Sequence, residues 1–195
     1  MTLSAPAPRR HLHTRTIHCQ GFQREDGLWD IEARIVDTKT YPYTEPYRGL
    51  RQAGDEVHDM AVRLTLDTDM EVRAIEVSMP ATPYPTCGKA EANYQRLIGT
   101  KIGAGWRRAV QEALGAARGC THVRELLFPM ATVAFQTLGG WREDGGESRE
   151  AGKPIERSES LAAGQRPYYI GGCVGWATDG EVVARLHPEF ASAKV

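Results

Sequence analysis

Apolar residues occupy every second position from Met60 to Leu66 in segment 56–66, and this alternation constrains the fold more than any other feature of the chain. Asp59 and Arg63 belong to the other set of positions. Successive side chains of a β-strand point to opposite faces of the sheet. The segment is therefore predicted to be a strand with one buried and one solvated face. The buried face would carry His58, Met60, Val62, Leu64 and Leu66.

Three more segments have the composition of strands, namely 14–23, 28–37 and 71–79. The first two flank Asp26-Gly27, and an Asp-Gly pair between apolar runs is a strong signal for a hairpin. Four strands in succession predict an antiparallel meander. Segment 40–55, between the second and third strands, is expected to be irregular because it contains two prolines and two glycines.

The spacing of apolar residues changes to a helical period from residue 89. Helices are predicted over 89–98, 104–114 and 122–138. Segments 168–177 and 181–186 are predicted to form a C-terminal β-hairpin that extends or closes the sheet. The expected fold class is therefore α+β, an antiparallel sheet (four-stranded N-terminal meander plus C-terminal hairpin) packed by about three helices.

A chain of 195 residues has the length of one domain, which we expect over residues 11–190. Residues 1–10 are expected to form a flexible tail. Segment 139–166 is rich in glycine and charge without periodicity, which is typical of a mobile loop.

The charge balance bears on possible partners. With 24 basic and 25 acidic side chains, the chain lacks the excess of positive charge typical of nucleic-acid binders. It has no apolar run long enough to span a bilayer and no signal-peptide core behind the basic start, so neither a membrane nor a nucleic acid is an expected partner, and the expected location is the cytoplasm. The four cysteines are widely separated and form no CxxC pair.

His58 is the first candidate for a functional residue. An imidazole among apolar neighbours needs a hydrogen-bond partner or a pocket. It could be a general acid or base, with Asp59 assisting, or a core histidine bonded to backbone. Arg63 could hold an anionic group of a substrate, or it could belong to a surface charge ladder with Asp59.

Gly119–Glu125 holds the second group of candidates, because Cys120, His122 and Glu125 lie within six residues at a predicted helix start. His122 could act as an acid or base oriented by Glu125. Alternatively, His122 and Cys120 could bind zinc or iron together with a group on the sheet, so metal binding stays open. The purely structural interpretation is a capped helix start in which Cys120 packs as a small apolar residue.

Substrate contacts are expected near these groups. Lys39 could hold a carboxylate or phenolate, and Cys120, two residues before His122, is also expected to contact the substrate. Aromatic side chains on segment 40–55 could stack on a ring; they are Tyr41, Tyr43 and Tyr47.

Several short strings occur in an order that resembles a bacterial family, the uncharacterised domain of unknown function 2889 (DUF2889). They are Arg15-Thr16-Ile17, Asp26-Gly27-Leu28-Trp29-Asp30-Ile31, Asp37-Thr38-Lys39, Val57-His58-Asp59-Met60, Gly105-Trp106-Arg107, Gly119-Cys120-Thr121-His122 and the closing Cys173…Trp176…Asp179-Gly180. The resemblance extends from about residue 9 to 190, with Val123 where the family pattern has leucine. It implies a bacterial cytoplasmic protein associated with aromatic-compound or acyl-CoA catabolism, and it places His58 and His122 in the family pattern. It implies no reaction.

The leading hypothesis is a cofactor-independent acid/base enzyme acting on an aromatic or hydroxylated catabolic intermediate. It would be a lyase, isomerase or hydrolase, with C–C cleavage by deformylation as one concrete case. One alternative is a non-enzymatic protein that binds a small molecule or acyl group; another is a metalloenzyme using His122 and Cys120. An enzyme requires two titratable groups within reach of one ligand atom, whereas a binding protein does not. A homodimer is a further expectation, because an open sheet edge invites pairing.

Overall fold

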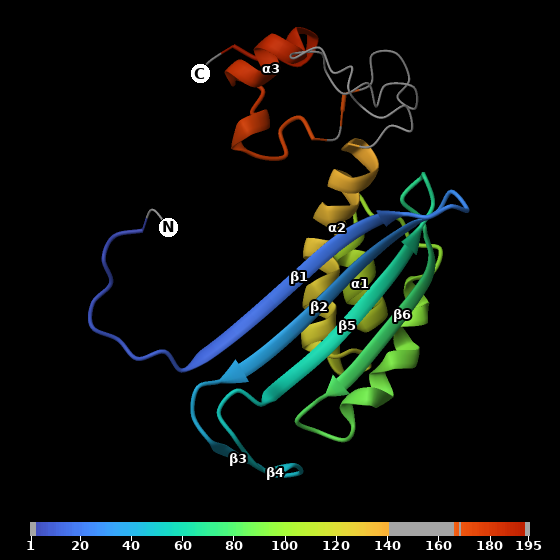
Figure 1. Ribbon diagram of the computed structural model, residues 1–195. Coiled ribbons are helices and arrows are strands. Elements are labelled where there is room, and N and C mark those ends of the chain that lie inside the picture. The colour runs from blue at the N-terminus through green and yellow to red at the C-terminus, as the bar shows by residue number, and fades with distance from the viewer. Residues whose placement is uncertain (1–2, 141–165, 168, 194–195) are drawn as a thin grey trace. The chain divides into compact units, whose positions relative to one another are not determined.

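The computed structural model describes residues 3–140, 166–167 and 169–193 (Figure 1). The chain divides into two compact units, Met1–Leu138 and Gly139–Val195, which are described separately below. The single domain expected over 11–190 stays a prediction. Residues 3–10 contain no helix or strand, and most of the expected loop 139–166 lies outside the described residues.

The first unit contains a four-stranded antiparallel sheet with the strand order β1-β2-β5-β6. Its strands are β1 (His13–Gln23), β2 (Trp29–Lys39), β5 (Glu56–Leu66) and β6 (Val72–Ala81). The four predicted strands are confirmed, and so is the turn at Gly27, which has a φ of 83°. Such a left-handed backbone conformation favours glycine.

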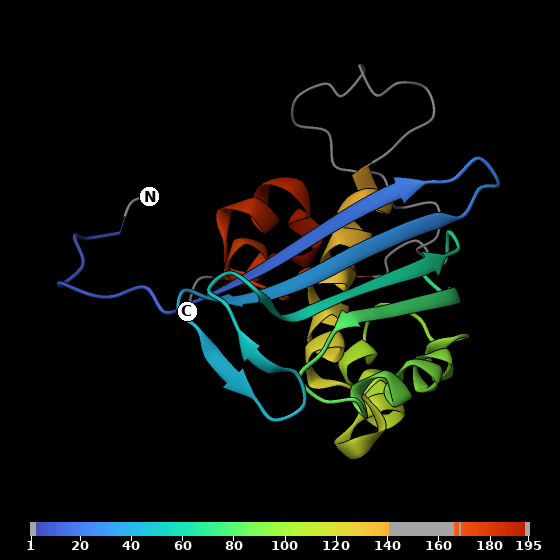
Figure 2. The same cartoon turned by 60° about the horizontal axis from the view of Figure 1, so that its bottom comes forward.

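A short hairpin lies in the segment expected to be irregular. It pairs β3 (Tyr43–Glu45) with β4 (Gly49–Arg51). Figure 2 shows it projecting from the end of the sheet where β2 ends and β5 begins. Glu45 is buried there and accepts hydrogen bonds from Arg48, which explains how an acidic side chain is tolerated inside the hairpin.

Helices cover one face of this sheet. They are the 3-10 helices η1 (Cys87–Leu97) and η2 (Ala116–Arg118) and the α-helices α1 (Trp106–Leu114) and α2 (Thr121–Gly140). Figures 1 and 2 show α1 and α2 on the same side of the sheet. The core lies between these two layers, where Ile31, Ile35, Met60 and Leu64 of the sheet and Val110, Leu126, Leu127 and Met130 of the helices are fully buried.

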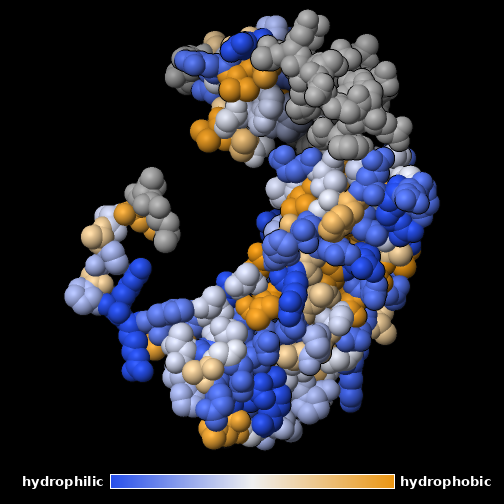
Figure 3. Space-filling model, in the orientation of Figure 1, coloured by the Kyte–Doolittle hydropathy of each residue, from blue (hydrophilic) through white to orange (hydrophobic). Residues whose placement is uncertain are grey.

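The opposite face of the sheet carries paired charges. Arg34 binds Asp59 across β2 and β5, and Arg63 binds both Glu32 and Glu76. Figure 3, which looks toward this face, shows mainly hydrophilic residues over the strands. The alternation of segment 56–66 is therefore confirmed on both faces, and the helices of the first unit cover the apolar one.

The second unit contains, among its described residues, the α-helix α3 (Glu181–Leu186) and the 3-10 helices η4 (Val174–Trp176) and η5 (Pro188–Phe190). The predicted C-terminal hairpin is wrong, because its second strand is helical and its first contains η4. Segment 181–186 is too short for its period to distinguish strand from helix. Glu181 lies in the first turn of α3, where a carboxylate stabilises the helix dipole, whereas the two adjacent valines favour a strand. The α+β class itself is confirmed by the first unit.

Candidate functional site

A buried carboxylate, Asp37, organises the polar side chains at one end of the sheet. Its side chain is 2% exposed, and it lies on the helix-covered face. The strand register places Asp37 directly between Arg15 of β1 and His58 of β5. Three neighbouring strands therefore contribute one polar residue each to a single row.

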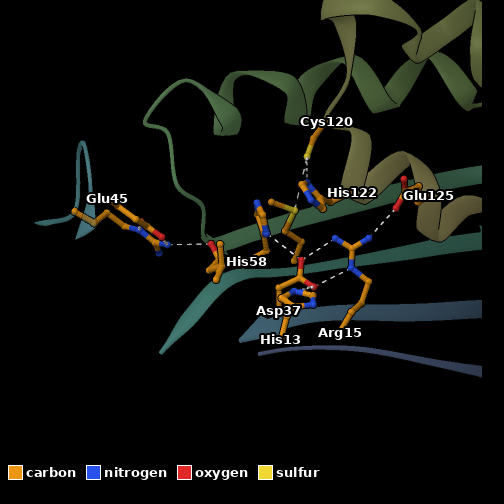
Figure 4. Close-up of polar contacts among 11 residues, drawn as sticks. His13, Arg15, Asp37, Glu45, His58, Cys120, His122 and Glu125 are labelled. Carbon is orange, nitrogen blue, oxygen red and sulfur yellow. Dashed lines mark hydrogen bonds and ion pairs between the residues drawn. The ribbon is translucent and has the colours of Figure 1, made fainter. Parts of the chain in front are cut away.

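Asp37 accepts hydrogen bonds from both neighbours in this row (Figure 4). Arg15 donates from Nε and Nη2 to the two carboxylate oxygens, each at 2.8 Å, and His58 Nδ1 lies 2.9 Å from Oδ2. His13 Nε2 lies 3.2 Å from Oδ1. A two-pronged contact between a guanidinium and a carboxylate is strong and directional, so it holds Asp37 in one orientation.

The charges in this row determine which nitrogen of His58 carries a proton. Burial raises the pKa of Asp37, but the hydrogen bond and charge of Arg15, together with His58, outweigh burial and leave the pKa below its ordinary value. An ionised carboxylate can only accept hydrogen bonds, so Nδ1 of His58 must be the donor. In the neutral ring, Nε2 then carries a free lone pair, which is the form of a general base.

A β-bulge lies immediately before His58. Asp37 is opposite His58, whereas the next residue, Thr38, is opposite Glu56, so Val57 is the extra residue. The carbonyl of Val57 accepts a hydrogen bond of 3.0 Å from Arg48 Nη2 in the hairpin. Bulges redirect side chains near functional sites, and this one is held by a contact from outside the sheet.

His122, at the start of α2, stacks on His58. The two ring centroids are 3.8 Å apart and the rings are inclined by 32°. One ligand atom from each of Asp37, His58 and His122 lies within 4.8 Å of the other two. The two histidines singled out from the sequence therefore lie in one cluster, close enough to contact a single ligand atom.

Both imidazoles have pKa values below the ordinary value for histidine. Burial is the largest cause for each ring. The charge of His122 lowers the pKa of His58 further, and the charge of Arg15 lowers that of His122. Both rings are therefore neutral at pH 7, and each can accept a proton.

Cys120 contacts His122, whereas Glu125 contacts Arg15. Cys120 Sγ lies 3.8 Å from His122 Nδ1, and Tyr94 holds the Cys120 backbone through its hydroxyl. Glu125 Oε2 accepts a hydrogen bond of 3.1 Å from Arg15 Nη1. Glu125 was expected to orient His122, and the structure shows its carboxylate bound to Arg15, a contact that stabilises the guanidinium.

Two predicted site residues, Asp59 and Arg63, lie on the outer face of the sheet, as the alternation of segment 56–66 predicted. Asp59 accepts two hydrogen bonds from Arg34, and Arg63 lines a charged groove on the outer face together with His18. Because β5 alternates, its odd-numbered residues here point away from His58. The expectation that Asp59 assists His58 is therefore corrected, because Asp59 belongs to the surface charge ladder. Arg63 belongs to the same ladder, and its role in holding an anionic group of a substrate stays a prediction.

The expected substrate-binding residues separate into two groups. Lys39 Nζ lies 4.0 Å from the ring centroid of Tyr43 and 5.6 Å from that of Tyr41. Tyr47 instead contacts Tyr84, with ring centroids 6.0 Å apart. Lys39 follows Asp37 by two positions on β2, so the group of Lys39, Tyr41 and Tyr43 begins next to the cluster. The role of this group in substrate binding stays a prediction.

Asp37 was missed in the sequence although a signal was present. Continuing the alternation of Trp29, Ile31, Ala33 and Ile35 by one step places Asp37 on the apolar face. A carboxylate at such a position needs charged or hydrogen-bonding partners. Arg15 gives no comparable signal, because only the strand register places it beside Asp37.

The comparisons with known proteins give a family but no activity. A family model described as a protein of unknown function (DUF2889) matches residues 13–136, which include Asp37, His58 and His122. No curated protein and no solved structure matches the chain. Among the described residues, no helix is both long and apolar enough to cross a membrane.

Proposed function

Since the chain belongs to the DUF2889 family, whose description names no reaction, we propose from its site that the protein is an acid/base enzyme in which His58 transfers a proton. The observation that carries this proposal is the partly buried Asp37–His58 hydrogen bond beside His122. A catalytic base needs a fixed tautomer and a second polar group near the reacting atom, and this cluster supplies both.

Each member of the cluster has a defined task in the proposed mechanism. His58 takes a proton from the substrate at Nε2, and the charge of Asp37 stabilises the imidazolium that results. Arg15 keeps Asp37 ionised and oriented through two hydrogen bonds. His122, stacked on His58, is the second group that can contact the reacting substrate atom.

The proposed substrate is an aromatic or hydroxylated catabolic intermediate, and the enzyme would be a lyase, isomerase or hydrolase that needs no cofactor. In a deformylation, His58 removes the hydroxyl proton of a hydroxymethyl group, the adjacent C–C bond breaks, and formaldehyde leaves. The electron pair left on carbon then takes up the proton from the imidazolium. Lys39 would bind a carboxylate or phenolate, and Tyr41 and Tyr43 would contact the ring.

A deuterium-exchange screen tests this proposal across a panel of candidate substrates. The protein, treated with a chelator, is incubated in D₂O with phenols and aromatic acids that carry hydroxylated side chains. Mass spectrometry then detects deuterium incorporation or cleavage, and a colorimetric assay detects formaldehyde. A base that exchanges its proton with the solvent transfers deuterium to the substrate, so labelling is detected even when the reaction equilibrium favours the substrate over the product.

The matched variants are His58→Ala and His18→Ala. His18 lies on the outer face of β1 and lines the charged groove there. We expect His58→Ala to lower the exchange rate by about 10²-fold or more and His18→Ala to leave it unchanged. Equal rates in folded His58→Ala and wild-type protein would exclude the proposal.

The non-enzymatic alternative requires an apolar cavity with one or two polar anchors. The convergence of three titratable groups within 4.8 Å favours the enzyme instead. The cytoplasmic location, the homodimer and the absence of nucleic-acid partners stay predictions. Size-exclusion chromatography with light scattering would determine the oligomeric state.

A further inference from the structure

We propose that Asp37, His58 and His122 form a binding site for one divalent transition-metal ion of the zinc class. The inference goes beyond the proposed proton transfer and does not rest on it, because the metal-free and metal-bound proteins can be examined separately. It rests on the positions of three donor atoms and on the chemistry of their side chains.

The positions of the donor atoms come close to a coordination geometry. One carboxylate oxygen and two imidazole nitrogens all lie within 4.8 Å of one another. A point no more than about 2.8 Å from all three atoms therefore exists, since that is the largest radius such a triangle allows. Zinc binds nitrogen and carboxylate oxygen at about 2.0–2.2 Å, so the side chains need to close in by less than about 1 Å.

The donor set indicates which ions would bind. Two imidazoles and one carboxylate are typical ligands of zinc, iron and cobalt, whereas magnesium and calcium prefer oxygen ligands alone. Three protein ligands would leave a position open for water or another small molecule.

The groups around the three donors support them. Nδ1 of His122 lies 3.8 Å from Cys120 Sγ, and such outer contacts orient a ring that binds a metal through its other nitrogen. The positive charge of Arg15, which binds Asp37 directly, opposes the binding of a cation. Glu125 contacts the same guanidinium and offsets part of its charge. Two carboxylates, Asp37 and Glu125, therefore contact the single guanidinium of Arg15, and this excess of acidic over basic side chains favours a divalent cation.

A titration of the metal-free protein tests the inference. The chain is treated with a chelator and dialysed, and Zn²⁺ is added in a calorimeter. Co²⁺ is added in a parallel titration that records visible absorption, because its spectrum reports the number and type of ligands. We expect one ion per chain for both metals, with a Co²⁺ spectrum characteristic of nitrogen and oxygen ligands.

The variants are His58→Gln, His122→Gln and the control His18→Gln, all with circular dichroism to verify folding. Glutamine keeps most of the side-chain volume, so the two cluster variants are expected to fold and avoid the loss of stability expected of Asp37 variants. We expect at least a 10-fold weaker Kd in each cluster variant and no change in the control. The inference is overturned if wild-type protein binds no stoichiometric ion, or if binding survives in both cluster variants.

Activity separates this inference from the proposed function. If the metal-free protein labels a substrate and Zn²⁺ inhibits labelling, both proposals stand, because the ion then blocks the base. If labelling requires the ion, the binding site stands and the cofactor-independent mechanism falls. If the protein labels a substrate but binds no ion, only the metal site is excluded.

Discussion

Replacing Asp37 by asparagine tests whether the buried carboxylate holds the three strands of the site together. The substitution keeps the shape of the side chain and removes its charge. Asp37 accepts two hydrogen bonds from Arg15 and one from His58, and its side chain is only 2% exposed. An asparagine presents one oxygen and an NH₂ group that cannot accept, so at least one donor loses its partner.

The expected cost follows from these contacts. A hydrogen bond to a charged group contributes about 1.5–3 kcal/mol, and an unpaired buried donor costs about 1–3 kcal/mol. Arg15 is 34% exposed and keeps its contact with Glu125, so solvent and that carboxylate recover part of the loss. We therefore expect Asp37→Asn to lower the free energy of unfolding by about 2–4 kcal/mol.

Asp59→Asn is the matched control. Asp59 also accepts two hydrogen bonds from one arginine, but that arginine lies on the outer face and is 58% exposed. Its substitution should therefore cost several-fold less. Urea unfolding at pH 7 with linear extrapolation measures both variants. Equal losses for the two variants, or a loss below about 0.5 kcal/mol for Asp37→Asn, would refute the reasoning.

The pH dependence of the Asp37→Asn effect provides a second measurement. The pKa of Asp37 is lowered in the folded protein, so its stabilisation is fully present above the unfolded-state value of about 3.9. The stabilisation is lost as the pH falls through the lower, folded-state pKa. The stability difference between wild type and Asp37→Asn should therefore narrow as the pH is taken from 5 toward 2, and a difference that widened would have the wrong sign.

Three further predictions concern packing and proton transfer. A Cβ on Gly21 would lie 1.9 Å from Thr137 Oγ1, so Gly21→Ala should lower the free energy of unfolding in urea by about 1–3 kcal/mol. Adding Thr137→Ala should restore part of this stability, and a double variant with no recovery would contradict the close approach of β1 and α2. Tyr94 is fully buried, and its hydroxyl contacts both backbone groups of Cys120. Tyr94→Phe should therefore lower the free energy of unfolding by about 1–3 kcal/mol, which a lower thermal midpoint would report. An unchanged midpoint would mean that water replaces the hydroxyl. Because the pKa of His58 is below its ordinary value, kcat/KM of the metal-free protein should be constant near pH 7 and should fall as the pH drops through that pKa. A value of kcat/KM that rises as the pH falls would exclude a neutral base.

Two of the four residues with a task in the proposed mechanism, His58 and His122, could be predicted from sequence patterns. His58 was predicted to be on the covered face because the apolar alternation of β5 includes it, and the structure places it there. His122 was predicted at a helix start, where α2 begins at Thr121. Neither pattern could show that the rings stack at 3.8 Å, because that distance depends on how α2 packs on the sheet.

The local pattern also could not determine the partners of each charge. Asp59 is adjacent to His58 in sequence, yet the strand sends the two side chains to opposite faces. Arg15 and Asp37 are 22 residues apart and meet only because β1 and β2 pair in one register. A shift of one residue would move Arg15 to the solvent face and leave the carboxylate without its strongest partner.

The sequence alone determined the four long strands and the helical segments of the first unit, and which strand face is buried, because periods of 2 and 3.6 are written directly in the order of apolar residues. It did not determine the short β3-β4 hairpin, which lies in the segment expected to be irregular. It did not determine the short C-terminal segment 181–186, where six residues are too few for a period. The tertiary structure decided the site, since strand register and helix docking bring together Arg15, Asp37, His58 and His122. Contacts between residues far apart in the chain depend on the packing of whole elements, and no local pattern encodes that packing.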